Sequence, residues 1–204
     1  MIAIIDYGVG NVLAFANAFK RLNIDATAAT SNADLARATK LILPGVGSFD
    51  RAMEHLNESG MRERIEQLVL VSAMPILGVC VGMQMLARSS QEGSMPGLGW
   101  INGQVNKFDG AALPAGTTLP HMGWNDVQPT TEGGLFTGLG DRARFYFLHS
   151  YYFSCGQPSH KIAMTDYGGL FCSAVRADNI MGVQFHPEKS HQFGSRLLKN
   201  FAEI

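Results

Sequence analysis

The sequence predicts an α/β fold in which a doubly wound, mainly parallel sheet is flanked by helices and extended by antiparallel strands in the C-terminal half. Two features predict this fold. Up to about residue 90, short apolar runs alternate with helical patterns, and parallel strands need helical crossovers of this kind. From about residue 97, short strands rich in glycine and proline follow one another, which favours antiparallel pairing.

The N-terminal half is expected to consist of βα units. Its apolar runs predict strands at residues 2–5, 26–29, 41–43 and 75–79. Apolar residues at helical spacing predict helices at about residues 11–21, 33–38, 49–57 and 61–72, and the start of another at 82–87. Asn11 can cap the first helix, and Ser59 with Gly60 can separate the two longer ones.

The C-terminal half is expected to add strands and one closing helix. The strands are predicted at residues 145–149, 151–154, 161–165 and 180–185, and the helix at about 192–201. No internal repeat, low-complexity tract or linker interrupts the 204 residues. Because the chain is 46% hydrophobic and 16% charged, it can bury a core of its own, and we expect residues 1–204 to form a single domain.

Charge and cysteine content narrow the function classes. Sixteen basic and 17 acidic residues give a formal net charge of −1, so neither a nucleic acid nor a membrane is expected as a partner. The three cysteines form neither a disulfide framework nor a metal-binding C-x-x-C pattern. The apolar start at residues 1–5 is far shorter than the roughly 20 residues that cross a bilayer. We therefore expect a cytoplasmic protein that binds no metal.

Residues 78–82 read Gly-Val-Cys-Val-Gly and lie between a predicted buried strand and a predicted helix. This is the pattern of a nucleophile elbow, in which glycines flank a sharp turn that exposes the nucleophile. The start of the following helix would lower the pKa of the Cys80 thiol and favour the thiolate. The alternative interpretation is a buried cysteine in an ordinary strand-to-helix turn.

A base for this thiol is found in residues 185–188, Phe-His-Pro-Glu. In an extended chain, side chains two residues apart point to the same side, so His186 and Glu188 can lie adjacent, with Pro187 keeping the segment extended. Glu188 would then hold one imidazole nitrogen and leave the other facing Cys80. The alternative is an ordinary surface pair of a histidine and an acid.

Residues 43–48, Leu-Pro-Gly-Val-Gly-Ser, follow one predicted strand and precede a helix. Their backbone amides can converge on a developing negative charge and form an oxyanion hole, although a plain strand-to-helix turn would have the same pattern. Neither this segment nor residues 6–11 has the spacing of a Walker loop or of G-x-G-x-x-G, so we expect no nucleotide cofactor.

Six ordered segments resemble the class I, or triad-type, glutamine amidotransferases, and the likeness covers nearly the whole chain. The segments are residues 4–11, 43–47, 78–84, 120–125, 146–152 and 182–190. Residues 120–125, His-Met-Gly-Trp-Asn after a proline, and residues 146–152 point to one branch of this family, the glutaminase subunits of imidazole glycerol phosphate synthase.

The resemblance implies a flavodoxin-like fold and the hydrolysis of L-glutamine to glutamate and ammonia by a triad of Cys80, His186 and Glu188. It further implies that the oxyanion hole is formed by Val46, Gly47 and Val81. The residues that it implies for glutamine binding are Gly45, Gln84, Ser150 and Tyr151. A (β/α)8-barrel cyclase subunit would receive the ammonia in a heterodimer, and the residues implied at that interface are Asn11, Trp124, Tyr146 and Lys189.

Three other interpretations remain open at this point. Residues 96–100 and 190–194 look like a related branch that supplies ammonia to an enzyme amidating a surface-polysaccharide sugar. The same scaffold carries cysteine peptidases and chaperone-like proteins with an elbow cysteine. A catalytically silent binding subunit is the third possibility, which an intact triad argues against.

Overall fold

The computed structural model describes residues 1–111, 113–114, 116–130, 133–140 and 143–204. Its strands are β1 (Ile2–Ile5), β2 (Ala26–Ala29), β3 (Lys40–Gly45), β4 (Ile76–Cys80), β5 (Ser89–Ser90), β6 (Gly103–Lys107), β7 (His121–Asp126), β8 (Gln128–Pro129), β9 (Arg144–His149), β10 (Tyr151–Cys155), β11 (Lys161–Asp166), β12 (Leu170–Ala177) and β13 (Ile180–Val183). Its α-helices are α1 (Val12–Arg21), α2 (Phe49–Glu58), α3 (Arg62–Glu66), α4 (Val81–Gln84) and α5 (His191–Glu203). Shorter helical turns are Asp34–Arg37, Gln67–Val71, Gly134–Phe136, Pro158–His160 and Pro187–Lys189.

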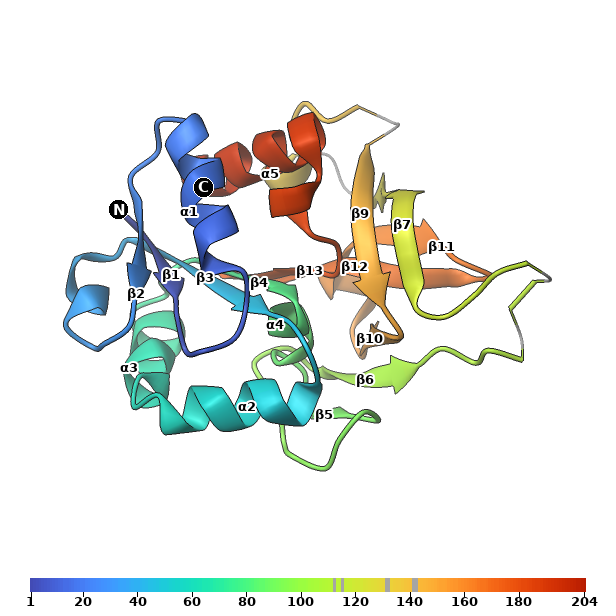
Figure 1. Cartoon of the computed structure of the whole chain (residues 1–204), viewed down its shortest axis with the longest axis horizontal. Coiled ribbons are helices and arrows are strands. Elements are labelled where there is room, and N and C mark those ends of the chain that lie inside the picture. The colour runs from blue at the N-terminus through green and yellow to red at the C-terminus, as the bar shows by residue number, and fades with distance from the viewer. Residues whose placement is uncertain (112, 115, 131–132, 141–142) are drawn as a thin grey trace.

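One sheet connects the two halves of the chain, with the strand order β2-β1-β3-β4-β13-β12-β10-β6-β5. The strands from β2 to β13 in this order are parallel, and those from β13 to β6 are antiparallel to their neighbours. Helices α1 and α5 cover one face of the parallel part, and α2 and α3 cover the other (Figure 1). The predicted doubly wound sheet with added antiparallel strands is therefore confirmed.

Helix α1 illustrates how the sequence builds these layers. The side chain of Asn11 accepts a hydrogen bond from the backbone N–H of Ala14 at 3.3 Å, so the predicted cap is present. Val12, Phe15 and Phe19 recur on one face of the helix and are buried.

Among the described residues, no helix combines the length and the apolar character that a membrane crossing requires.

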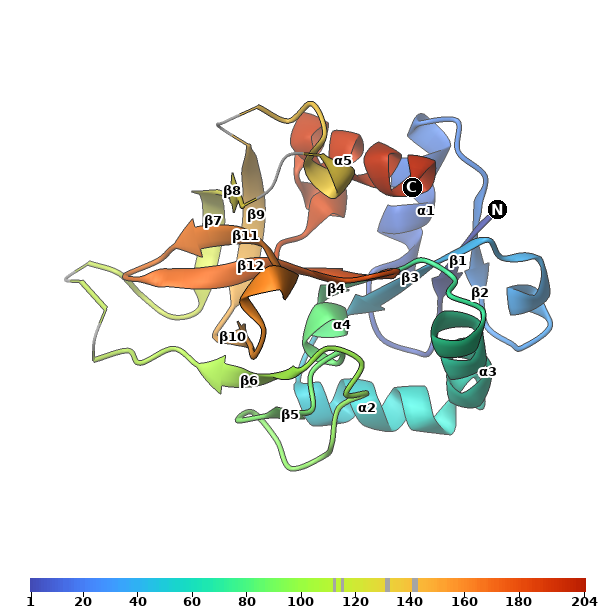
Figure 2. The same ribbon diagram turned by 180° about the vertical axis from the view of Figure 1, so that it is seen from behind.

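Two strands lie where the sequence analysis did not expect them. β13 was expected to be an antiparallel strand; it is antiparallel to β12 on one side, but on the other side it pairs in parallel with β4, with Val183 opposite Val79. All four of its residues are buried, as is usual for a parallel strand that is covered on both faces. The prediction that residues 145–149 extend the main sheet is also wrong, because β9 pairs with β7 in a separate two-stranded sheet. Figure 2 shows β7 and β9 beside the antiparallel end of the main sheet.

Candidate active site

Cys80 stands at the carboxyl end of β4 in a strained backbone conformation. Its φ is +56°, which is uncommon for any residue other than glycine. A Cβ atom added to Gly82 would overlap the carbonyl oxygen of Leu43, and one added to Gly78 would lie 2.5 Å from the carbonyl oxygen of Gly82. The turn therefore requires both flanking glycines, and its geometry is that of a nucleophile elbow.

The helix after Cys80 is shorter than the sequence analysis expected. α4 ends at Gln84, whereas the pattern predicted a helix that begins over residues 82–87. The carbonyl groups that would continue it are taken by a later loop: Leu98 N donates to Met85 O at 2.8 Å and Ile101 N donates to Leu86 O at 3.0 Å. Because α4 is a single turn, its dipole is small. The expected stabilisation of a thiolate by this helix therefore has little support.

His186 and Glu188 form a buried pair. The Nδ1 atom of His186 lies 2.9 Å from Oε1 of Glu188, and the two side chains are 4% and 1% exposed. The expectation that Pro187 keeps this segment extended is wrong. Pro187–Lys189 is a 3-10 turn with proline in its first position, where the missing N–H costs nothing, and the hydroxyl of Ser190 closes the turn by donating to His186 O at 2.6 Å.

The charge state of His186 is set by its two neighbours. Burial acts to lower its pKa, but interactions with Cys80 and Glu188, through hydrogen bonding and negative charge, raise the pKa above its ordinary value. Since the carboxylate occupies Nδ1, Nε2 is the nitrogen left for the thiol side. This environment favours the protonated, imidazolium form of His186.

Cys80 and His186 line the same cavity, whose volume is about 300 Å³. The predicted oxyanion residues Val46, Gly47 and Val81 line it too, as do Ser150, Tyr151 and Lys189. Its other lining residues are Glu92, Pro120, Leu148 and His149. The described residues contain no group of three potential metal ligands.

Two residues predicted to bind glutamine lie behind the cavity wall. Gly45 is opposite Cys80 in the pairing of β3 with β4, and a Cβ added to it would overlap the backbone N of Gly82. The Nε2 atom of Gln84 donates to Tyr151 O at 3.1 Å and to Gln184 Oε1 at 3.0 Å, so its amide is engaged within the protein. Both residues shape the site, but neither lines the cavity.

Three residues near Cys80 were missed by sequence reasoning. The Nε2 atom of Gln184 lies 3.8 Å from the sulfur of Cys80. The hydroxyl of Tyr7 donates to Pro44 O at 2.6 Å, and burial, with the charge of Cys80 second, raises the pKa of Tyr7 so that it stays protonated. Glu92 accepts a hydrogen bond from Phe49 N at 2.8 Å. Tyr7 and Gln184 lie inside the resembling segments, whereas Glu92 carries no local signal.

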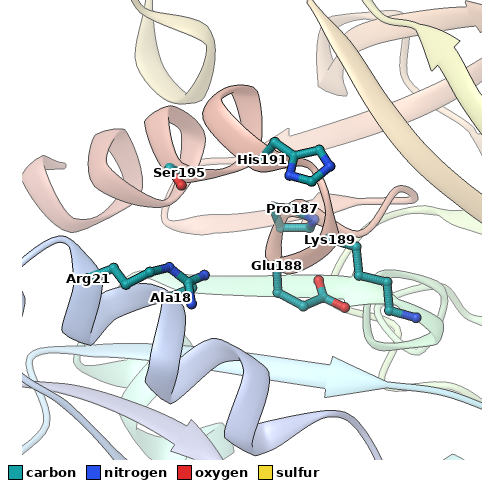
Figure 3. A pocket seen from close by; sticks show the side chains of 7 residues that line it. All are labelled: Ala18, Arg21, Pro187, Glu188, Lys189, His191 and Ser195. Atoms are coloured by element: carbon teal, nitrogen blue, oxygen red, sulfur yellow. The ribbon is translucent and has the colours of Figure 1, made fainter.

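A second cavity, of about 270 Å³, lies on the other side of the triad carboxylate between α1 and α5. Figure 3 shows Arg21 reaching toward it from α1, with Glu188 and Lys189 on the facing segment. Lys189 also lines the first cavity. The Oε2 atom of Glu188 is buried and has no hydrogen-bond partner among the described residues, so the carboxylate is held mainly through its contact with His186.

Three of the four residues predicted at a subunit interface are in contact with one another. The ring of Trp124 packs edge-on against Tyr146 with 6.3 Å between centroids, and the Lys189 ammonium lies 5.9 Å from the centre of the Tyr146 ring. Trp124 is also stacked on His191 at 5.3 Å. Asn11, the fourth, is exposed at the start of α1.

Comparison with known proteins identifies relatives over the full chain. The family model described as "Glutamine amidotransferase class-I" matches residues 3–204. The imidazole glycerol phosphate synthase subunit HisH of Bdellovibrio bacteriovorus is 58% identical over 204 residues, which cover all of both chains. The protein of the same name from Leptospira interrogans is 51% identical, again over all of both chains.

Solved structures have the same fold. A structure described as a glutamine amidotransferase superposes with a TM-score of 0.75 at 20% identity, covering 100% of this chain and 99% of that one. PurLQS from Thermotoga maritima gives a TM-score of 0.75 at 16% identity, with 99% and 97% covered.

Proposed function

The chain belongs to the class-I glutamine amidotransferase family, and from that premise we propose that it is the glutaminase subunit of an imidazole glycerol phosphate synthase. The observation that carries the chemistry is the elbow cysteine, Cys80, in one cavity with His186, which is itself paired with Glu188. Full-length relatives that are named as HisH subunits support the pathway, histidine biosynthesis.

In the proposed reaction, the Cys80 thiolate attacks the side-chain carbonyl carbon of L-glutamine and forms a tetrahedral oxyanion. His186 gives its proton to the nitrogen, the C–N bond breaks, and ammonia leaves a glutamyl thioester. His186 then takes a proton from water, whose oxygen attacks the thioester carbon. Glutamate departs, and the sulfur leaves as the thiolate that began the cycle. Glu188 keeps Nδ1 occupied and stabilises the imidazolium.

We assign stabilisation of the oxyanion to backbone amides at Val46, Gly47 and Val81. Their residues line the cavity beside Cys80, which supports this role. The hydrogen bond from Tyr7 to Pro44 O holds the adjoining peptide of β3. Each such donor typically contributes roughly 3 kcal/mol to the stability of the transition state.

We assign recognition of the amino-acid end of glutamine to Ser150, Tyr151 and Glu92. One carboxylate oxygen of Glu92 accepts from Phe49 N, and the other is available for the α-ammonium group. Burial, with the charge of Asp50 as a smaller cause, raises the pKa of Glu92, so a bound cation would favour its ionised form. Gln84 and Gly45 act from behind the wall by fixing Tyr151 and the turn at Gly82.

A partner subunit is supported by the surface around the cavity mouth. Val46 and Leu148 line the cavity and are also exposed, and Met122 and Trp124 lie exposed on the neighbouring strand β7. An apolar rim of this kind suits a protein partner that excludes water from the mouth. We propose a heterodimer in which a (β/α)8-barrel cyclase receives ammonia there and makes imidazole glycerol phosphate and aminoimidazole carboxamide ribotide.

We propose a cytoplasmic location and a single domain for this subunit. Cys80, Cys155 and Cys172 are all unpaired and buried, which fits a reducing compartment. One continuous sheet joins the parallel and antiparallel halves, which supports a single domain over residues 1–204. The alternatives of a sugar amidotransferase subunit, a cysteine peptidase, a chaperone-like protein or a silent subunit gain no support from the names of the compared relatives.

The direct test is Cys80→Ala in the complex with the cyclase. Release of ammonia from glutamine should be lost, while synthesis from added ammonium salt should persist, because the fold and the partner surface remain. Cys172→Ala is the matched control, since it removes another buried thiol away from the cavity and should keep glutaminase activity. Glutamine hydrolysis by the Cys80→Ala complex at the native rate would overturn the proposed function.

A further inference from the structure

A chain of hydrogen bonds runs through two buried histidines beside the glutamine cavity. The Nδ2 atom of Asn125 lies 3.2 Å from Nε2 of His121. The Nδ1 atom of His121 lies 3.0 Å from Nε2 of His149, whose Nδ1 atom lies 2.8 Å from the carbonyl oxygen of Tyr151. His149 and Tyr151 line the cavity, whereas His121 and Asn125 belong to β7.

The direction of every hydrogen bond in this chain is fixed from both ends. At one end Tyr151 O can only accept, so His149 must carry its proton on Nδ1. At the other end the side-chain amide of Asn125 is oriented by two backbone groups: its Nδ2 donates to Asp166 O at 2.8 Å, and its Oδ1 accepts from Asp126 N at 2.8 Å. Asn125 therefore donates to His121 Nε2, and His121 donates from Nδ1 to His149.

This arrangement requires both histidines to be neutral. A further proton on either ring would place two donors face to face within the chain. Burial also favours the neutral form of both rings, since His121 is 2% and His149 is 6% exposed. His121 is held from its two faces by Tyr167 and Phe147, with ring centroids 3.8 Å and 4.6 Å away.

The Tyr151 end of this hydrogen-bond chain joins a second set of hydrogen bonds, which lies behind Cys80. Tyr151 O accepts a second hydrogen bond from Gln84, and Gln84 in turn contacts Gln184, whose amide lies beside the sulfur of Cys80. The carbonyl of Tyr151 is thus held by His149 from one direction and by Gln84 from another. Its orientation fixes the segment that presents Ser150 to the cavity.

We propose that His121 and His149 are positioning residues, which hold the Ser150–Tyr151 wall of the cavity in the geometry that binds glutamine. This inference rests on the proposed glutaminase function and adds residues that act through the wall rather than on the substrate, since both ring nitrogens of His149 are engaged within the protein. Because His121 and Asn125 lie on β7, the wall depends on the placement of that strand, whose Met122 and Trp124 belong to the exposed rim.

Two substitutions at position 121 separate this role from a purely structural one. His121→Phe keeps a ring between Tyr167 and Phe147 but removes both hydrogen bonds. His121→Asn loses the stacked ring, while its side-chain nitrogen takes the place of Nδ1 and can still donate to His149. In the complex with the cyclase, we expect His121→Phe to raise the KM for glutamine roughly tenfold with a smaller change in kcat, because an acceptor at His149 is left unpaired.

The KM of His121→Asn decides whether His121 acts through its hydrogen bonds or only through packing. We expect its KM to stay within about threefold of the native value, although its melting temperature should fall below that of His121→Phe because a ring is lost. If KM follows the melting temperature across the two variants, His121 is only a packing residue and the inference is wrong. Asn125→Ala leaves both rings in place and should raise KM in the same direction, which covers the case in which a ring variant does not fold.

A spectroscopic measurement tests the hydrogen-bond chain independently of any activity assay. In ¹⁵N NMR of the full-length protein, both histidines should show the Nδ1–H tautomer and remain neutral at pH 6. A proton on Nε2 of His149, or a charged ring at that pH, would contradict the inference. Absence of glutamine hydrolysis by the native complex would instead refute the proposed function, and the NMR result would still decide whether the chain exists.

Discussion

Two buried histidine sites flank the glutamine cavity, and their charge states are opposite. His186 lies against the carboxylate of Glu188 and the thiol of Cys80, and its pKa is raised. His149 lies against another imidazole and a carbonyl group, and burial lowers its pKa to about 3. Both rings are almost inaccessible to solvent, so burial alone does not decide whether a histidine is charged. The difference lies in the partners of each ring. Anions beside His186 stabilise its added proton, whereas His149 faces a neutral hydrogen-bond donor that leaves no place for one.

The strongest way to break this contrast is to neutralise the anion beside His186. Glu188→Gln should lower the pKa of His186 and reduce kcat for glutamine hydrolysis by roughly 10²- to 10³-fold, about 3–4 kcal/mol of transition-state stabilisation, which is less than the loss caused by Cys80→Ala. The kinetics of the variant with its cyclase would measure this.

The matched control is Glu63→Gln, which removes a carboxylate from α3, away from the cavity, and should leave kcat unchanged. The pKa of His186 in Glu188→Gln can be measured by NMR. An unchanged value would mean that Cys80 alone sustains the positive charge of His186.

The second prediction uses the opposite pH dependence of the two sites. The folded-state pKa is about 4 for His121 and about 3 for His149, below the ordinary 6.5, so these groups favour folding fully above pH 6.5 and lose that contribution as pH falls toward 4. The raised pKa of His186 has the reverse effect: its contribution is complete below pH 6.5 and is lost as pH rises.

Urea denaturation between pH 7 and pH 4 should therefore show a loss of up to roughly 3 kcal/mol for each of His121 and His149. His121→Phe should show a shallower loss than the native protein over this range. An equal slope in the two proteins would mean that His121 becomes protonated without cost in the folded state.

The smallest effect tests whether the two sites are independent. The Ser190 hydroxyl donates to His186 O and accepts from Tyr146 N at 3.0 Å. Ser190→Ala leaves the partly buried N–H of Tyr146 without this acceptor and should cost about 1–2 kcal/mol of unfolding free energy. Ser195→Ala in α5 is the control and should cost less than about 0.5 kcal/mol. In NMR the resonances of His186 should shift while those of His149 stay in place; movement of both would mean that the sites are coupled.

The features that the sequence predicted well are local ones. The glycines around Cys80 and the two-residue spacing of His186 and Glu188 are each contained within five residues, so a pattern in the sequence reports the geometry directly. The strand positions in the parallel half were predictable for a similar reason, because buried strands appear as continuous apolar runs.

The features that escaped prediction depend on distant segments. Four buried apolar residues in β13 have the same pattern whether the strand runs parallel or antiparallel to its neighbour. α4 is cut short because a loop from residues 97–101 donates hydrogen bonds to the carbonyl groups of Met85 and Leu86, which follow the helix. Glu92 meets Phe49, and His121 meets His149, only through tertiary structure. A turn after His186 brought Glu188 into contact where an extended chain had been assumed, so the correct pair was predicted from an incorrect backbone.

The parallel pairing of β13 with β4 also has a consequence for synthesis on the ribosome. Cys80 is translated long before His186, and the strand that carries the histidine to the cysteine inserts beside β4 only after both β12 and β13 have been made. At about 5–20 residues per second, the nascent chain holds the cysteine without its base for roughly 5–20 seconds. During that interval the thiol lacks the neighbour that activates it, and a truncated chain that stops before β13 would carry the nucleophile without its base.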